Sequence, residues 1–185
     1  MKNNFRYFLC FLLMVTHLAA ADRYEELFPA TFQIGENELQ RKGVSKLVVG
    51  YIFNVYVAAF YQLPESGPAQ ALADQPRHLE IEYLRDLAKD DFTGAAEDML
   101  AKQHSPAVIA SIRDGINEIN KLYQDVRKGD RYALSYTPGT GTELIFNGQS
   151  KGIIPGTDFA RIYFSIWLGA KHPYQSFRDK LVGAK

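Results

Sequence analysis

Histidines are the first residues to test for chemistry, because imidazole binds metal ions and transfers protons near neutral pH. Beyond the first 21 residues the sequence holds three of them, at His78, His104 and His172. No two are four residues apart as in a His-Glu-x-x-His helix, and no Asp-x-Asp-x-Asp-Gly loop occurs. The sequence therefore predicts no metal site, and it indicates no other cofactor.

A serine nucleophile is suggested only superficially, by the segment Gly148-Gln149-Ser150-Lys151-Gly152. A nucleophile elbow joins a strand to a helix, whereas this segment follows the hairpin signal Asn147-Gly148. The acidic residues of segment 85–91 are typical of loop charge and of the first turn of a helix. We predict no catalytic residue from these patterns.

The N-terminal 21 residues have the pattern of a cleaved export signal. Lys2 and Arg6 precede an apolar run from Phe8 to Val15, and Ala19-Ala20-Ala21 supplies small residues for cleavage. The apolar run is shorter than the roughly 20 residues that span a bilayer. We therefore expect a mature protein of residues 22–185, without an integral membrane segment, in the periplasm or secreted.

The composition of the mature chain limits its chemistry and its partners. Cys10 is the only cysteine and would leave with the signal, so we expect no disulfide and no thiolate site. Removing Lys2 and Arg6 lowers the basic count from 21 to 19 against 21 acidic residues, a formal charge of −2. This balance does not favour nucleic acid as a partner. It says nothing about the oligomeric state.

Strands are predicted where apolar residues alternate or fill both faces. Residues 46–61 are apolar on both alternating faces, which predicts one long strand covered on both sides. Residues 78–84 alternate polar with apolar side chains, which predicts a strand with one solvent-exposed face. Further strands are expected at residues 31–35, 131–136, 143–146 and 151–154.

Helices are predicted in the middle and at the end of the chain. Asp90 or Asp91 can cap a helix that continues to residue 100, and Ser105-Pro106 starts a helix with an apolar stripe up to residue 123. Residues 157–168 form an almost wholly apolar helix that Gly169 can end in the left-handed conformation, and a short amphipathic segment follows. Strands and helices in this order predict a single α+β domain with a mainly antiparallel sheet.

Seven short segments together resemble bacterial chalcone-isomerase-like proteins. The more specific are Val55-Tyr56-Val57-Ala58-Ala59 and Ile166-Trp167-Leu168-Gly169; the others are Tyr83-Leu84-Arg85-Asp86-Leu87, Lys128-Gly129-Asp130, Phe146-Asn147-Gly148, Gly152-Ile153-Ile154 and Gly156-Thr157-Asp158-Phe159. The resemblance extends from about Phe28 to Val182. It implies an α+β open-faced β-sandwich, in which an antiparallel sheet carries a helical layer on one face.

The plant enzymes of this family cyclise chalcones, and the resemblance assigns their cleft positions to this sequence. Tyr51 stands where the enzymes carry a threonine, Phe92 where they carry a tyrosine, and Met99 where they carry an asparagine. Their arginine position falls at Arg41, or at Ser45 when Gly43-Val44 anchors the alignment. Phe92 and Met99 cannot donate a hydrogen bond to a developing enolate. The resemblance thus implies the family's cleft without its catalytic groups.

These observations predict a noncatalytic binding protein whose cleft, lined by Arg41, Tyr51, Phe92 and Met99, takes an apolar or amphiphilic small molecule. A fatty acid is the ligand class that non-enzymatic relatives in the family imply. Two alternatives stay open: an isomerase or lyase acting on another substrate, and an interaction protein of the cell envelope without a small-molecule ligand. A cleft filled by side chains would favour the interaction protein, and a continuous apolar pocket would favour the binding protein.

Overall fold

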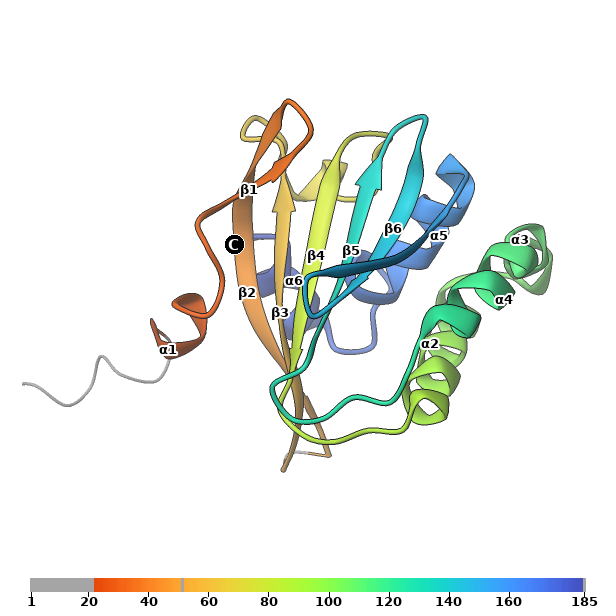
Figure 1. Ribbon diagram of the computed structural model, residues 1–185, viewed down its shortest axis with the longest axis horizontal. Helices are drawn as coiled ribbons and strands as arrows, with labels where there is room; N and C mark the ends of the chain where they lie inside the picture. The colour runs from red at the N-terminus through yellow and green to blue at the C-terminus, as the bar shows by residue number, and fades with distance from the viewer. Residues whose placement is uncertain (1–21, 51, 185) are drawn as a thin grey trace, which may run out of the picture.

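The computed structural model describes residues 22–50 and 52–184, and within them a single antiparallel sheet organises the fold. The seven strands lie side by side in sequence order, each hydrogen-bonded to the next (Figure 1). Their bounds are β1 Thr31–Ile34, β2 Asn37–Val49, β3 Phe53–Gln62, β4 Arg77–Tyr83, β5 Arg131–Thr137, β6 Gly141–Phe146 and β7 Gln149–Ile154. The predicted export signal, residues 1–21, lies outside the described residues.

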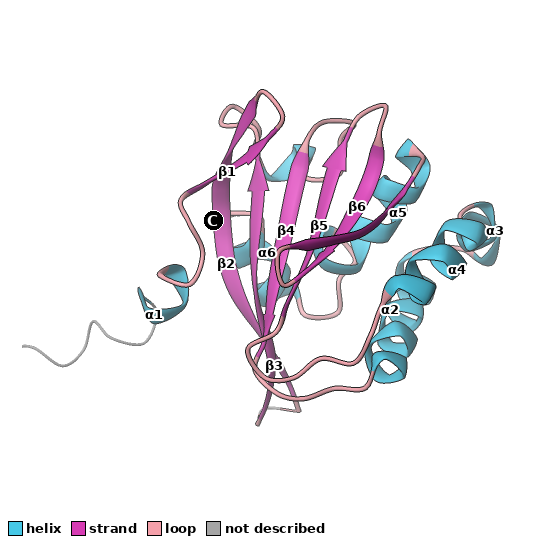
Figure 2. Cartoon of the chain, in the orientation of Figure 1, coloured by secondary structure: helices cyan, strands magenta, loops and turns pink. Residues whose placement is uncertain are grey.

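Helices α2 to α6 gather beyond one side of this sheet, whereas α1 lies apart from them, to the left of β2 in Figure 2. Their bounds are α1 Asp22–Glu25, η1 Pro68–Gln70, α2 Lys89–Gln103, α3 Pro106–Ser111, α4 Arg113–Leu122, α5 Thr157–Leu168 and α6 Gln175–Leu181. Helices α5 and α6 lie behind the sheet in the view of Figure 1, with α2, α3 and α4 to their right. Within the described part of the chain, no helix combines the length and apolar character needed to cross a bilayer.

Strand β3 divides the interior into two hydrophobic clusters, because its side chains alternate between the two faces of the sheet. Ala58 and Phe60 belong to the larger cluster under the helices, the helical face. Val57, Ala59 and Tyr61 belong to the smaller cluster on the opposite face, which the N-terminal segment and β1 cover. All five are fully buried, which confirms that this segment is covered on both sides.

Two sequence predictions about strands are wrong. Residues 46–61 form parts of two strands, because Gly50 takes a positive φ of 59° and the chain reverses between β2 and β3. Strand β4 does not have the predicted solvent-exposed face, because His78 is buried and stacks on Phe32 with ring centroids 3.6 Å apart. The strands expected at residues 131–136, 143–146 and 151–154 are confirmed as β5, β6 and β7, with the hairpin at Asn147-Gly148.

Helix boundaries differ from the sequence predictions in three places. The helix expected from Ser105 to residue 123 breaks at Ile112 into α3 and α4. Helix α2 begins at Lys89, whose backbone N–H donates to the Asp125 carboxylate at 2.9 Å, so neither predicted aspartate is its cap. Gly169 ends α5 with a φ of −67°, an extended rather than left-handed conformation.

Candidate functional site

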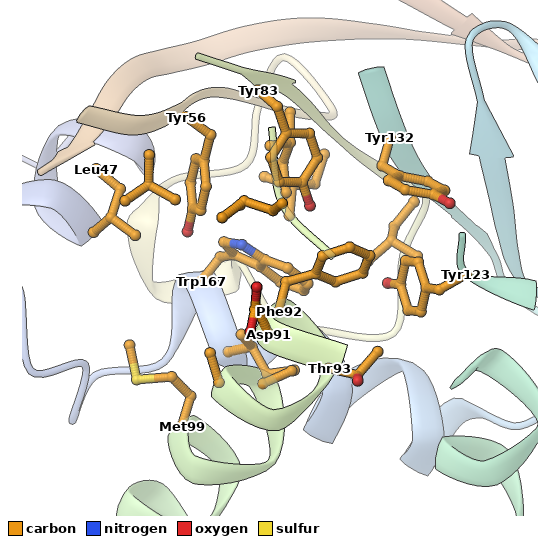
Figure 3. A pocket seen from close by; sticks show the side chains of 18 of the residues that line it. Leu47, Tyr56, Tyr83, Asp91, Phe92, Thr93, Met99, Tyr123, Tyr132 and Trp167 are labelled. Atoms are coloured by element: carbon orange, nitrogen blue, oxygen red, sulfur yellow. The ribbon is translucent and has the colours of Figure 1, made fainter. Parts of the chain in front are cut away.

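A cavity of about 330 Å³ lies between the helical face of the sheet and helices α2 and α5 (Figure 3). Its wall is formed by side chains from β2 to β5, from both helices, and by Tyr174 before α6. Most of them are aliphatic or aromatic. The volume is at the lower end of the range of small-molecule sites.

Helix α2 contributes one wall through residues spaced three and four apart. Phe92, Ala95, Ala96 and Met99 lie on one side of the helix and all line the cavity. The Phe92 ring packs edge-on against Tyr123, with centroids 5.1 Å apart. The structure thus brings together Phe92 and Met99, two of the four residues expected in the cleft.

Arg41 lies on the opposite face of the sheet and does not line this cavity. It pairs across strands with Tyr61, whose side chain belongs to the opposite cluster, and paired residues point to the same face. Its guanidinium donates to the backbone carbonyls of Glu25 and Phe28 at 2.6 and 2.5 Å and forms an ion pair with the Glu25 carboxylate. The expectation of an arginine at the cleft is therefore not met by Arg41.

Ser45, the other residue proposed for the arginine position, faces the helical side. It pairs with Ala58 of the larger cluster and is buried. Of the two alignments, only the one anchored at Gly43-Val44 is compatible with the side of the sheet that carries the cavity, and it places a serine where the family's enzymes have a guanidinium. Tyr51, the remaining predicted site residue, lies outside the described residues.

Two tyrosines that the sequence reasoning missed lie at the centre of the cavity wall. Tyr56 of β3 and Tyr83 of β4 are cross-strand partners with ring centroids 6.1 Å apart, and both hydroxyls point into the space beside Phe92 and Trp167 (Figure 3). The Trp167 indole lies beside the Tyr56 hydroxyl and partly offsets the effect of burial on its pKa. Burial raises the pKa of Tyr56 and of Tyr83, so both remain neutral hydrogen-bond donors.

Three other lining tyrosines, Tyr123, Tyr132 and Tyr163, have hydroxyls that are already engaged within the protein. The hydroxyls of Tyr123 and Tyr163 lie 3.2 Å apart, and burial raises the pKa of both groups. The Tyr132 hydroxyl accepts from the Gln124 backbone N–H at 2.9 Å and donates to its carbonyl at 3.3 Å. Among the described residues no such partner is recorded for the Tyr83 hydroxyl.

Charged side chains are confined to the rim of the cavity. Asp91, Asp98 and Lys102 of α2 line it, and all three residues are exposed. A second, more open cavity of about 840 Å³ adjoins the first at Leu47 and Tyr174, between β2 and α6. The enclosed wall thus offers neutral donors, while formal charges lie at its edge.

A histidine and a serine do meet in the interior, but on the opposite face. His78 Nδ1 lies 2.6 Å from the Ser135 hydroxyl, and both residues are buried. Desolvation lowers the pKa of His78 to about 3, so its imidazole stays neutral at ordinary pH. Buried away from the cavity, the pair serves packing and not nucleophilic chemistry.

Comparison with known proteins agrees with this geometry. A family model described as chalcone isomerase-like matches residues 25–183. A search of curated proteins found no match. Among solved structures, a fatty-acid binding protein of Arabidopsis thaliana superposes with a TM-score of 0.62 and 14% identity, over 84% of this chain and 91% of that chain. These findings confirm the α+β fold that the sequence resemblance implied.

Proposed function

The chain belongs to the chalcone isomerase-like family, and from this premise we propose that it is a noncatalytic binding protein whose cavity holds an apolar or amphiphilic small molecule such as a fatty acid. The observation that carries the proposal is the cavity itself: a continuous, mostly apolar space between sheet and helices that side chains leave open. Apolar walls with a few converging polar groups are typical of ligand sites. A side-chain-filled cleft would instead have favoured a pure interaction protein.

The residues on α2 support binding rather than chalcone cyclisation. Phe92 and Met99 line the cavity, and by resemblance they replace the tyrosine and asparagine of the enzymes. Neither side chain can donate a hydrogen bond to an enolate oxygen. We expect chalcone cyclisation no faster than the uncatalysed reaction, and saturable turnover inhibited by the flavanone product would contradict this.

The ligand class is suggested by a relative and by simple energetics. The Arabidopsis protein of similar fold is named a fatty-acid binding protein. Each buried methylene contributes about 0.8 kcal/mol, so partial burial of about eight to ten methylenes gives a gross term of roughly 6 to 8 kcal/mol. The loss of ligand freedom must be subtracted from this sum. Micromolar affinity for a medium-length chain is therefore within reach.

Trp167 supplies a direct test, because it is the only tryptophan of the sequence and lines the cavity. We expect its fluorescence to change saturably as dodecanoic acid, dodecanol or methyl dodecanoate is added to the purified protein. Native mass spectrometry of protein purified without delipidation should show one small molecule retained. No fluorescence change with any of the three ligands and no retained mass would overturn the proposal.

We also propose that the protein acts outside the cytoplasm, in the periplasm or secreted. The proposal is supported by the charged start, the short apolar run and the alanine site of residues 1–21. N-terminal sequencing of the protein from fractionated cells should give a chain that begins at Asp22 in the exported fraction. Full-length protein in the cytoplasm would contradict it.

A further inference from the structure

The polar groups of the cavity carry an inference about the ligand that rests on the proposed function and makes it more specific. The enclosed wall contains two phenolic donors side by side, on Tyr56 and Tyr83. Among the described residues the hydrogen bonds include no protein acceptor for the Tyr56 O–H, which stays protonated because burial raises its pKa and is therefore free to donate. Tyr83 has no recorded protein partner among the described residues, so its O–H is also free. Two unused donors therefore point into one apolar space.

Cations, by contrast, lie away from these donors. Among the lining residues of the first cavity that the structure describes, Lys102 is the sole Lys or Arg. It is exposed, and it lies about three α-helical turns beyond Asp91 and Phe92. Asp91 and Asp98 place two carboxylates on the same rim. A ligand carboxylate inside the cavity would lose its hydration without gaining an opposite charge, which is costly.

The second cavity has more lysines, but two of them are engaged elsewhere. Lys42 Nζ donates to the Pro64 carbonyl at 2.8 Å, and Lys46 Nζ lies over the Tyr24 ring at 5.3 Å from its centroid. Lys180 on α6 remains, at the exposed outer side. These groups are rim positions and do not neutralise a charge beside Tyr56 and Tyr83.

We infer that the ligand of this cavity is an uncharged amphiphile, whose polar end is a carbonyl, ether or hydroxyl oxygen that accepts hydrogen bonds from Tyr56 and Tyr83. Its apolar part lies against Phe92, Met99 and Trp167. An ester, an alcohol or an aldehyde fits this description. A long-chain fatty acid fits it in its protonated form, and the carboxylate anion does not.

A matched ligand series tests the inference on the unmodified protein. Methyl dodecanoate, dodecanol and dodecanoic acid share a chain and differ in the head, and Trp167 fluorescence measures the affinity of each. At neutral pH we expect the ester and the alcohol to bind at least about tenfold more tightly than the acid. The acid should gain affinity as the pH falls towards about 5, where it begins to take up its proton.

Removing single hydroxyls locates the head group. Tyr83→Phe should weaken binding of the ester roughly two- to tenfold, and Tyr56→Phe should do the same. Tyr136→Phe is the matched control: it removes a hydroxyl from the helical face of the sheet, but Tyr136 does not line the cavity and its hydroxyl bonds to Asp74 and Thr157, so ester affinity should stay unchanged. Thermal unfolding checks that each variant is folded.

The outcomes separate this inference from the function on which it rests. If dodecanoic acid binds more tightly than the ester at neutral pH, and Lys102→Met or Lys180→Met removes that preference, the inference is overturned while the binding function stands. If Tyr56→Phe and Tyr83→Phe both leave ester affinity unchanged, the donor pair is not the head-group site. If no ligand binds at all, the proposed function fails, and this inference fails with it.

Discussion

The two faces of the sheet use polar residues in opposite ways. On the opposite face, Arg131 bonds to the carboxylates of Glu80 and Glu82 at 3.1 and 2.5 Å and to the Leu27 carbonyl at 3.0 Å, and Arg41 holds the N-terminal segment in a similar way. On the helical face, the hydroxyls of Tyr56 and Tyr83 point into an open cavity. Polar groups that bond within the protein hold its segments together, whereas free donors in a cavity can bond to a ligand.

The largest effect should come from placing a charge in the cavity wall. Phe92→Asp puts a carboxylate where the ligand packs, so we expect about a hundredfold loss of affinity for every member of the ligand series, because the carboxylate would be desolvated. Phe92→Leu, which keeps the wall apolar, is the control and should retain binding. Equal binding by the Asp and Leu variants in fluorescence titrations would place the ligand elsewhere.

On the opposite face, the expected effect of a substitution is on stability. Arg131→Ala leaves Glu80 and Glu82 without their partner and releases the Leu27 carbonyl, so the free energy of unfolding should fall by about 3 kcal/mol. Urea denaturation measures this change. The affinity of the folded protein for the ester should not change, and a large loss of affinity would show that the two faces are not independent.

Arg41→Ala tests the same distinction at the residue that the family resemblance proposed for ligand binding. It removes two hydrogen bonds to backbone carbonyls, so stability should fall by about 1 to 2 kcal/mol. Arg113→Ala, which removes an exposed pair with Glu97, is the control and should change stability by less than about 1 kcal/mol. The relative affinities for acid and ester should be the same in both variants. Selective loss of acid binding in Arg41→Ala would show that Arg41 contributes to the ligand site.

The effect that is smallest near neutral pH concerns the pH dependence of stability. His78 has a pKa of about 3 in the folded protein, below its ordinary value, because burial disfavours the charged form. As the pH falls below about 6.5, His78 takes up a proton in the unfolded chain but not in the folded one. The free energy of unfolding therefore falls by up to about 1.4 kcal/mol per pH unit until His78 titrates in the folded protein. His78→Gln should show a shallower slope in denaturation at a series of pH values. An unchanged slope would mean that His78 is protonated in the fold.

The parts of the molecule that sequence could predict are those with local signals. Residues 131–154 read as three strands because alternation and Asn147-Gly148 are local features, and Phe92 and Met99 share a face because they are seven residues apart on one helix. The family resemblance predicted the fold because its motifs are also short local segments. None of these inferences needed a contact between distant segments.

The parts that sequence missed depend on register and packing. Strands β2 and β3 carry register irregularities between Arg41 and Gly43 and between Leu47 and Val48, and each shift changes which residues face the cavity. Tyr56 and Tyr83 become a pair only through the β3–β4 register. No single-sequence pattern shows either feature.

A tight side-chain contact follows the helix break that periodicity did not predict. An ideal Cβ on Gly115 of α4 would lie 2.5 Å from the Phe159 ring of α5, so the two helices approach closely at this point. The apolar stripe of residues 109–123 is compatible with one straight helix, but the structure divides it at Ile112. A periodic apolar stripe therefore does not by itself show where a helix breaks.

The most direct test of the account is an NMR titration of the Met99 methyl group. Of the 3 methionines in the sequence, only Met99 lies beyond the first 21 residues, so the labelled methyl is a single probe inside the cavity. The account predicts that methyl dodecanoate shifts this resonance saturably, with the same dissociation constant as the Trp167 fluorescence change, and that Phe92→Asp abolishes the shift. A Met99 resonance that stays fixed while the ligand saturates the protein would contradict the assignment of this cavity as the binding site.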